Sequence, residues 1–485
     1  MIHHPLIMTV TSISGAIRII MICGSVVMME TGCRTYTAQS QAMSQQWKTG
    51  HADCAALEFG NKADLSKSTD SIVWHLEAGT AYRTIGNFQE SNRHFDAAAV
   101  RIDDYEQQAK LKVGHEAMAV MSNLQNLPYT GHSYDKIMLH AYKALNYLCE
   151  GEYDKARPEV IRAYQCQQDA VEENKSRIEE AQNAAKSSND RQAIDNTMAD
   201  TTFSHSLAEV NKNCEGFSFY ANYVNPFVVY LDGLYFLYCG SDVADMERAR
   251  KSLSRVKEIA GENRYIDADL QSAGGTGSNQ TSKSYTYVIL ENGEAASLDQ
   301  VRIDVPIIFS KVSYVGTAFP TLVFHNNQID HLLVKAGDTE EQTALIANMD
   351  SVIALDFKNE WPVILTKTIA STVSKAVAAY AVNEAAKQVG KHQDQTGAAL
   401  ISLCSRIATA AYQAAVNIAD TRSWTTLPKE FQIARVASPT DRKIVLSTPN
   451  SGPVDVNLID GTINVVYVRC INSFSPMAIS QFKLK

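Results

Sequence analysis

The chain has 485 residues, of which 45% are hydrophobic and 20% are charged, and its formal net charge is −9. This length accommodates roughly two to four domains, and the hydrophobic content excludes a wholly disordered chain. The acidic balance argues against nucleic-acid binding, because no excess of basic side chains is present to neutralise phosphates.

The first 33 residues have the pattern of a targeting segment. Arg18 precedes an apolar run, Ile19–Met29, which has the length of a signal-peptide core and is too short to span a bilayer. The small residues before Cys33 resemble the end of a bacterial lipoprotein signal, although Glu30 replaces an apolar residue of that pattern. We expect lipid attachment at Cys33; a plain secretory signal and a retained amphipathic anchor are the alternatives.

Residues 34–70 are polar and are expected to form a tether that leads into a first helix near Ala52–Phe59. Of the nine cysteines, Cys23 would leave with the signal and Cys33 would be acylated, so seven would remain and at least one thiol would be unpaired. No Cys-x-x-Cys pair suggests a zinc or redox centre.

Two blocks of sequence repeat one spacing of small and aromatic residues. In each block a glycine is followed by an aromatic residue after two positions and by small residues after five and twelve positions. The predicted packing residues are Gly79, Tyr82, Gly86, Phe88, Ser91, Phe95 and Ala98 in the first block, and Ala144, Tyr147, Gly151, Tyr153, Ala156 and Ala163 in the second. The spacing predicts two antiparallel helices joined at the glycine, with small residues at the contact and rings in the groove.

The repeated spacing resembles the tetratricopeptide repeat (TPR), whose unit is ~34 residues long. Asn225–Val256 returns to this style and predicts a third hairpin, so we expect a TPR-like helical domain at residues 71–265. Within it, residues 164–212 are rich in Gln, Glu, Asn and Lys. They predict a projecting pair of extended polar helices, with a disordered insertion as the alternative.

A Gly/Ser linker at residues 266–284 is expected to precede a β-rich module at residues 285–485. Segments of β-branched and aromatic residues predict its strands, with Asp460-Gly461 as a hairpin turn. An Ala-rich helical pair is expected at residues 361–420. The predicted fold class is therefore α+β: a TPR-like helical hairpin array with a projecting polar helical pair, then a β-rich module that a helical pair interrupts.

Sequence motifs give little support to a catalytic or ligand-binding site. Gly277–Ser284 approaches a phosphate-binding loop, but it lacks the second glycine and leads into a strand instead of a helix. The histidines are dispersed, so we expect packing or surface roles for them, no metal site and no small-molecule cofactor. Glu291 and Glu294 are the nearest candidates for a glycosidase acid/base pair, and a turn around Asn292-Gly293 explains them better.

Asp420, Arg422 and Trp424 form another unusual string. They predict either a polar site or a structural junction. We favour the junction, in which Asp420 and Arg422 form a charge-assisted bond and Trp424 packs on the sheet.

The strings "NPFVVYLDGLYF", "VILENGEAASLDQVRIDVPI" and "ADTRSWTTLPKEFQIARV" follow a repeat array and a lipoprotein-like start. With them the chain resembles a family of uncharacterised bacterial TPR lipoproteins over residues 74–468. The resemblance implies an exported protein that is lipid-anchored, faces the periplasm and sits in the outer membrane of a Gram-negative-type envelope. It also implies envelope proteins as partners, among them lipoproteins similar to peptidoglycan-synthase activators, and it implies no catalytic residues.

The leading hypothesis is a membrane-tethered scaffold that binds protein partners through the helical surface. The rival is an envelope hydrolase that acts on peptidoglycan or polysaccharide with a carboxylate site between the two domains. A cluster of buried carboxylates with displaced pKa values in one cleft would favour the hydrolase. A groove of aromatic, Asn and Arg side chains without such a cluster would favour the scaffold. A pore-associated subunit that uses the Ala-rich helices is a third, minor option.

Overall fold

The computed structural model describes residues 36–66, 69–111, 127–212, 220, 223–274, 284–309, 312–390 and 418–485. The proposed lipid-attachment residue Cys33, nearly all of the phosphate-loop-like string and the second helix of the expected Ala-rich pair lie outside these ranges. Within these ranges, no helix combines the length and the apolar character needed to cross a membrane.

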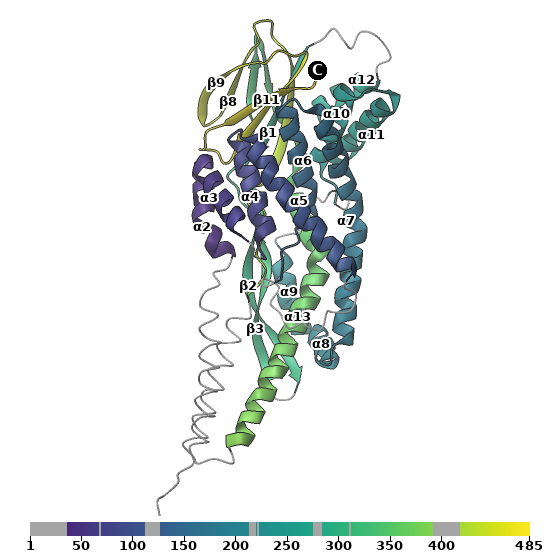
Figure 1. Ribbon diagram of the computed structural model, residues 1–485, viewed down its shortest axis with the longest axis vertical. Coiled ribbons are helices and arrows are strands. Elements are labelled where there is room, and N and C mark those ends of the chain that lie inside the picture. Colours follow the sequence, from purple (N-terminus) through teal and green to yellow (C-terminus); the bar gives the residue numbers. More distant parts are fainter. Residues whose placement is uncertain are drawn as a thin grey trace, which may run out of the picture.

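The first half of the chain is helical and the second half is rich in strands, which confirms the α+β class (Figure 1). The helices are α2 (Tyr36–Lys48), α3 (Ala52–Leu65), α4 (Ser71–Thr84), α5 (Phe88–Leu111), α6 (Ser133–Cys149), α7 (Tyr153–Ser187), α8 (Arg191–Met198), α9 (Thr201–Asn211), α10 (Pro226–Cys239), α11 (Val243–Ala260), α12 (Arg264–Gly274) and α13 (Met349–Gly390). The strands are β1 (Tyr285–Asn292), β2 (Ser297–Phe309), β3 (Val312–Val323), β4 (Leu333–Ala336), β5 (Thr339–Gln342), β6 (Ala344–Asn348), β7 (Glu430–Ala437), β8 (Lys443–Thr448), β9 (Ser451–Asn457), β10 (Ile463–Cys470) and β11 (Ala478–Lys483).

Helical hairpins form where the repeated spacing predicts them, as α4/α5, α6/α7 and α10/α11, and we call these hairpins together the helical arc. Gly86 and Gly151 make the turns of the first two, with φ of +79° and +76°, in the left-handed region that favours glycine. At the first helix contact, the hydroxyl of Ser91 donates a 2.7 Å hydrogen bond to the carbonyl of Gly79, which lies directly against the ring of Phe95. Gly79 and Ser91 therefore allow the two helices to approach closely, and the ring of Phe95 fills the space between them.

The remaining predicted packing residues differ in how deeply they lie. Four alanines of the two blocks are buried: Ala98, Ala144, Ala156 and Ala163. The aromatic residues Tyr82, Phe88, Tyr147 and Tyr153 are half-buried. Tyr153 also reaches beyond the arc, because its hydroxyl donates a 2.9 Å hydrogen bond to the carbonyl of Lys483 in β11.

We expect Gly79→Ala to lower the free energy of unfolding by about 3 kcal/mol. An added Cβ would lie 2.4 Å from a ring carbon of Phe95, whose side chain is fully buried, so the ring or the helix would have to shift. On an exposed helix the same substitution would raise the free energy of unfolding by about 1 kcal/mol. The sign of the measured change therefore shows whether Gly79 lies at a close helix contact. Urea denaturation measures the change. Gly86→Ala is the control. Its added Cβ meets no described atom within 4 Å, so the substitution should lower the free energy of unfolding only by the strain of a left-handed alanine, about 1 kcal/mol. An equal or larger loss for Gly86→Ala would contradict the tight contact between Gly79 and Phe95.

The first helix expected near Ala52–Phe59 is confirmed as α3, but the expected tether before it is wrong where the structure describes it. Residues 36–48 form α2, which buries Tyr36, Met43 and Trp47. The stretch is polar on average, but these large apolar side chains recur at helical spacing and give it a face that packs in the core.

The expected linker at residues 266–284 is also wrong in its first part, because α12 extends to Gly274. The side-chain oxygen of Asn263 accepts a 3.0 Å hydrogen bond from the backbone N–H of Tyr265 and begins the helix. Ile266 and Ala273 are buried on its inner face.

The polar stretch 164–212 continues α7 and then forms α8 and α9. These last two helices are packed, not free-standing, because Ile194 and Phe203 join Val305 and Phe319 in a second hydrophobic cluster. We call α8, α9, β2, β3 and the described part of α13 the arm; it extends away from the rest of the molecule (Figure 1).

The strands form a five-stranded sheet in the order β11-β10-β1-β7-β6, a four-stranded sheet in the order β5-β4-β8-β9, and the β2-β3 ribbon of the arm. β1 runs parallel to β10 and antiparallel to β7. The predicted hairpin at Asp460-Gly461 is wrong, because β9 and β10 belong to different sheets and these residues connect them. Every residue of β10 is buried, which suits a strand between two neighbours, whereas β9 is an exposed edge.

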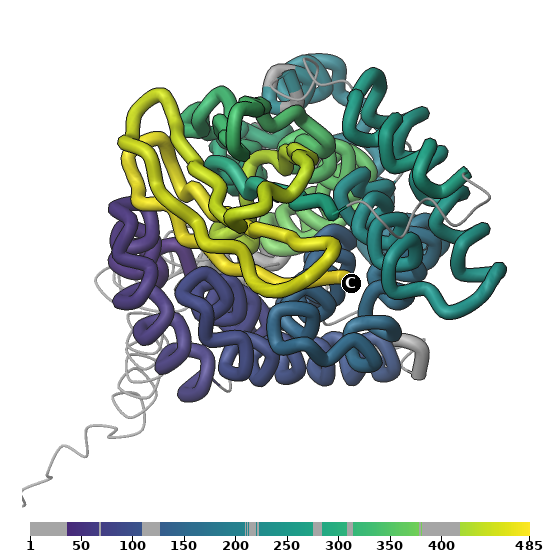
Figure 2. The backbone as a smooth tube through the Cα atoms, turned by 90° about the horizontal axis from the view of Figure 1, so that it is seen from above, coloured from purple at the N-terminus to yellow at the C-terminus, as the bar shows by residue number. Residues whose placement is uncertain are grey.

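The helical arc curls around the five-stranded sheet (Figure 2). Its inner helices α4, α6 and α10 are almost wholly buried, and one hydrophobic core contains residues from both these helices and the sheet. Across the contact, the rings of Phe227 and Phe431 stack at 3.8 Å, and the guanidinium of Arg83 lies 4.6 Å from the ring of Tyr467. The inner face that stacked hairpins commonly offer to partners is therefore filled by the protein's own sheet.

Candidate functional site

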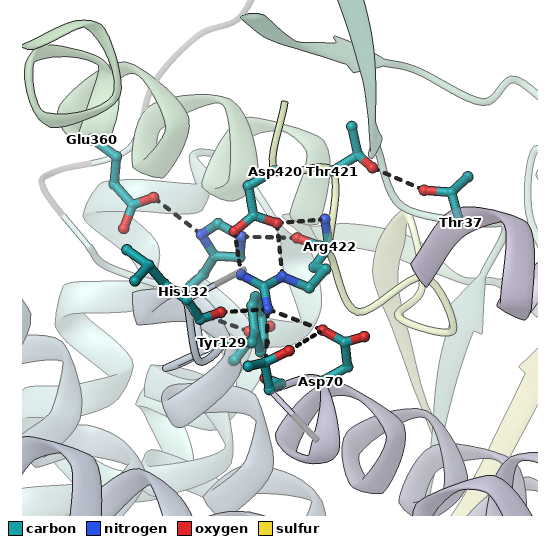
Figure 3. A network of polar contacts seen from close by, with 11 residues as sticks. Thr37, Asp70, Tyr129, His132, Glu360, Asp420, Thr421 and Arg422 are labelled. Atoms are coloured by element: carbon teal, nitrogen blue, oxygen red, sulfur yellow. Dashed lines mark hydrogen bonds and ion pairs between the residues drawn. The ribbon is translucent and has the colours of Figure 1, made fainter. Parts of the chain in front are cut away.

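The loop before β7 carries Arg422, whose buried guanidinium joins three parts of the chain (Figure 3). Its Nε and Nη2 donate to the two carboxylate oxygens of Asp420, at 2.8 and 2.6 Å. Its Nη1 donates to Asp70 at the start of α4, at 3.0 Å, and to the carbonyl of Leu127, at 2.9 Å. The predicted bond between Asp420 and Arg422 is confirmed, and it also anchors the helical arc.

Trp424 lies in the core that the sheet and the helical arc share, and it contacts three helices of the arc, which the sequence did not predict. Its indole N–H donates to the hydroxyl of Thr80 in α4 at 2.9 Å, and its ring lies 5.8 Å from Phe95 and 5.7 Å from Tyr142. The side chain is 1% exposed. Trp424 therefore packs next to Phe95 in the first hairpin, and its indole N–H has a hydrogen-bond acceptor, Thr80, inside the core.

Glu77 of α4 fixes the same loop from the helical side. Its carboxylate, fully buried, accepts hydrogen bonds from the hydroxyl of Tyr36 and from the backbone N–H groups of Thr425 and Thr426, at 2.8 to 3.0 Å. Burial raises the pKa of Glu77, and these hydrogen bonds oppose the rise. Residues 420–426 are thus held to the arc by two buried polar centres and one buried ring.

A cavity of about 170 Å³ lies beside this loop. Its walls come from residues 127–132, Arg177 of α7, the middle of α13 (residues 357–375), the β2-β3 ribbon and residues 418–422. Glu360 and His132 border it, and His132 is the N-cap of α6. The cavity thus lies where the arc, the arm and the loop before β7 meet.

A buried cluster of ionisable groups stands at the edge of the cavity. The Nδ1 of His132 lies 3.1 Å from Oε2 of Glu360 and 3.6 Å from Oδ2 of Asp356. The other oxygen of Glu360 accepts a 2.5 Å bond from Arg177 of α7. His132 Nε2 lies 3.4 Å from the carbonyl oxygen of Arg422, which links this cluster to the Arg422 centre (Figure 3).

The cluster displaces the pKa values of its members in opposite directions. Burial disfavours the charged form of His132, but Glu360 and the other carboxylates outweigh it and raise the pKa of His132 to about 10. Burial, with repulsion from Glu360, raises the pKa of Asp356 to about 8. For Glu360, burial is outweighed by Arg177 and His132, which hold the pKa of that carboxyl well below its usual range.

His75 and His94 meet in the first hairpin, where their Nδ1 atoms lie 2.9 Å apart. Arg93 donates to Nε2 of His94 at 2.9 Å and also binds both oxygens of Asp64. Since Nε2 of His94 accepts, its proton sits on Nδ1 and is donated to His75, and no lone pair of His94 is left for a metal. We interpret the pair as a packed, hydrogen-bonded contact, as expected for histidines inside repeat helices.

The two histidines predict a loss of stability in acid. Burial lowers the pKa of His75 to about 3 and, with Arg93, that of His94 to about 4, against 6.5 in the unfolded chain. The unfolded state therefore binds protons at a higher pH than the folded state, and stability falls as the pH drops from 6.5 to 4, by about 3 kcal/mol for each histidine. Urea denaturation across this range should show a flatter pH dependence in the double variant H75Q/H94Q. Equal slopes in the wild type and the double variant would contradict the assignment.

Other residues singled out in the sequence do not join the cluster. Glu291 accepts from the hydroxyl of Tyr467 at 2.6 Å, and Glu294 lies 3.2 Å from Lys48. His51 bonds to Thr49, and Cys54 is an exposed free thiol. Each of these groups has a local structural partner or lies at the surface.

Sequence reasoning missed Asp356 and Glu360, because it began the helix at residue 361 instead of Met349. Two acids four positions apart, between the apolar runs at residues 352–355 and 361–365, are the sequence feature that indicates them. His132 followed by Asp135 has the spacing of a capping box, which marks the start of α6.

No protein-family model matches this chain, and neither a curated protein nor a solved structure matches it.

Proposed function

We propose that this protein is a scaffold of the bacterial cell envelope that binds protein partners and is held at the membrane by a lipid on Cys33. The observation that supports a scaffold is the helical arc with its shared core, because stacked helical hairpins are a common architecture for binding proteins. A lipid tether would confine the arc to the envelope and raise the effective concentration of its partners.

Because the inner face of the arc is filled, we expect a partner to bind the outer helices α5, α7 and α11. Val100 of α5 and Val171 of α7 are 60% and 47% exposed, so apolar side chains face solvent on this outer side. The proposal therefore differs from the usual use of such an array, in which the concave face takes the partner.

Photo-crosslinking in the native envelope tests the scaffold. A photoreactive residue at position 100 or 171 should trap the same envelope protein, and one at the exposed arm position Tyr314 serves as the matched control. Failure to trap a protein at either outer position, together with cleavage of muropeptides by the purified chain, would contradict the scaffold.

One observation favours the hydrolase as a second candidate: Asp356 and Glu360 are buried carboxylates with oppositely displaced pKa values beside a cavity. The cavity of about 170 Å³ is, however, below the ~300 Å³ at which ligand pockets usually begin, and Glu360 is already engaged by Arg177 and His132. Digestion of purified muropeptides by the wild type and by the Glu360→Gln variant separates the two candidates. Cleavage that the substitution abolishes would favour the hydrolase.

A further inference from the structure

We propose that His132, Asp356 and Glu360 bind one divalent transition-metal ion, zinc or manganese, at the edge of the cavity. One ligand atom from each residue lies within 4.8 Å of the others. The separations from His132 Nδ1, 3.1 Å to Glu360 and 3.6 Å to Asp356, are close to those between ligands that each lie ~2.0–2.2 Å from a common ion.

Asp356 gives an independent indication of a ligand. Its side chain is 2% exposed, and neither of its carboxylate oxygens has a hydrogen-bond partner among the described residues. A buried carboxyl group in this state stays neutral unless a cation compensates its charge. Its Oδ2 is directed toward His132, where such a cation would sit.

Neighbouring groups orient the side chains of Glu360 and His132, as hydrogen-bond partners commonly orient residues that bind a metal. Arg177 binds Oε1 of Glu360 and leaves Oε2 turned toward His132. The Nε2 of His132 faces the carbonyl oxygen of Arg422, which favours the tautomer with a lone pair on Nδ1.

The charges at this place also fit a divalent ion. Asp135, which accepts a 2.9 Å hydrogen bond from the backbone N–H of His132, is a third buried carboxylate beside Asp356 and Glu360. Ionised, the three carry three negative charges; Arg177 supplies one positive charge and the proton on His132 supplies a second. A divalent ion that displaces this proton would bring two positive charges in its place.

The donor set selects the class of metal. One imidazole nitrogen and two carboxylate oxygens suit zinc or manganese, whereas magnesium and calcium prefer oxygen ligands throughout. Because His132 and Glu360 border the cavity, a position for water remains beside three protein ligands, as in open metal sites.

Calorimetric titration of the purified, chelator-treated full chain with Zn²⁺ and with Mn²⁺ tests the site. We expect one ion per chain, and at least tenfold weaker binding in Asp356→Asn. That variant keeps the shape of the side chain and removes only its ability to ionise, so it should fold; circular dichroism verifies this. His94→Gln, which alters the other histidine–carboxylate cluster, is the matched control and should bind like the wild type.

A thermal shift gives a second readout. Zinc should raise the melting temperature of the wild type and of His94→Gln, and leave that of Asp356→Asn unchanged. The proposal is overturned if the folded wild type binds neither Zn²⁺ nor Mn²⁺, if Asp356→Asn binds as tightly as the wild type, or if His94→Gln is the variant that loses binding. Equal or tighter binding of Mg²⁺ or Ca²⁺ would overturn the assignment to a transition metal.

Discussion

Replacing Arg422 with methionine is expected to lower the free energy of unfolding by about 3–5 kcal/mol. The substitution keeps much of the side-chain volume but leaves Asp420, Asp70 and the carbonyl of Leu127 without their shared donor inside the protein. Arg422→Lys should be intermediate, because an ammonium group keeps the charge but does not reproduce the forked bond to Asp420. Urea denaturation followed by circular dichroism measures both losses.

Arg250→Met is the matched control for this prediction. Arg250 also pairs with a carboxylate, that of Glu247, but both side chains are exposed on α11, so its removal should change stability little. Similar losses for the Arg250 and Arg422 variants would show that the Arg422 centre is not a buried junction.

Truncating Trp424 to alanine is expected to cost about 3–5 kcal/mol. The substitution leaves a cavity between Phe95 and Tyr142 and removes the donor to Thr80. Trp424→Phe keeps a ring in place and loses the hydrogen bond, so it should cost about 1 kcal/mol beyond any repacking. Thermal and urea unfolding of the two variants check the order; equal losses would mean that the ring does not carry the contact.

The helical hairpins were predictable because their signal is local. Gly86 and Gly151 stand at turns that need a left-handed residue, and Gly79 stands where two helices touch. Residues within about thirty positions decide this geometry, so one sequence is sufficient to find it.

The junction around Arg422 was predictable only in part, for the same physical reason. Asp420 is two positions away and was found, whereas Asp70 is 352 positions away and no local spacing indicates it. The contacts of Trp424 with α4 to α6 were not predicted, because these helices are equally remote in the sequence.

The positions of the strands were predictable from the sequence, but their pairing was not. The segments themselves follow from β-branched and aromatic composition, but Asp460-Gly461 joins two sheets because β10 pairs with β1 and β11. A turn signal fixes the local backbone, and the pairing of the strands is settled by burial elsewhere.

The inner face of the helical arc is filled by the five-stranded sheet and is therefore closed to a partner. Stacked helical hairpins with an open concave face bind partners there, but in this protein the five-stranded sheet already fills that face. The arc and the sheet should therefore behave as one cooperative body, with residues 420–426 as a principal attachment.

Native-state hydrogen exchange in increasing urea tests this claim most directly. The slowest amides of α4 in the arc and of β10 in the sheet should open with one common free energy, and Arg422→Met should lower both by the same amount. If the amides of α4 opened at a clearly lower free energy than those of β10, or if the variant affected only one of the two elements, the arc and the sheet would be separate units.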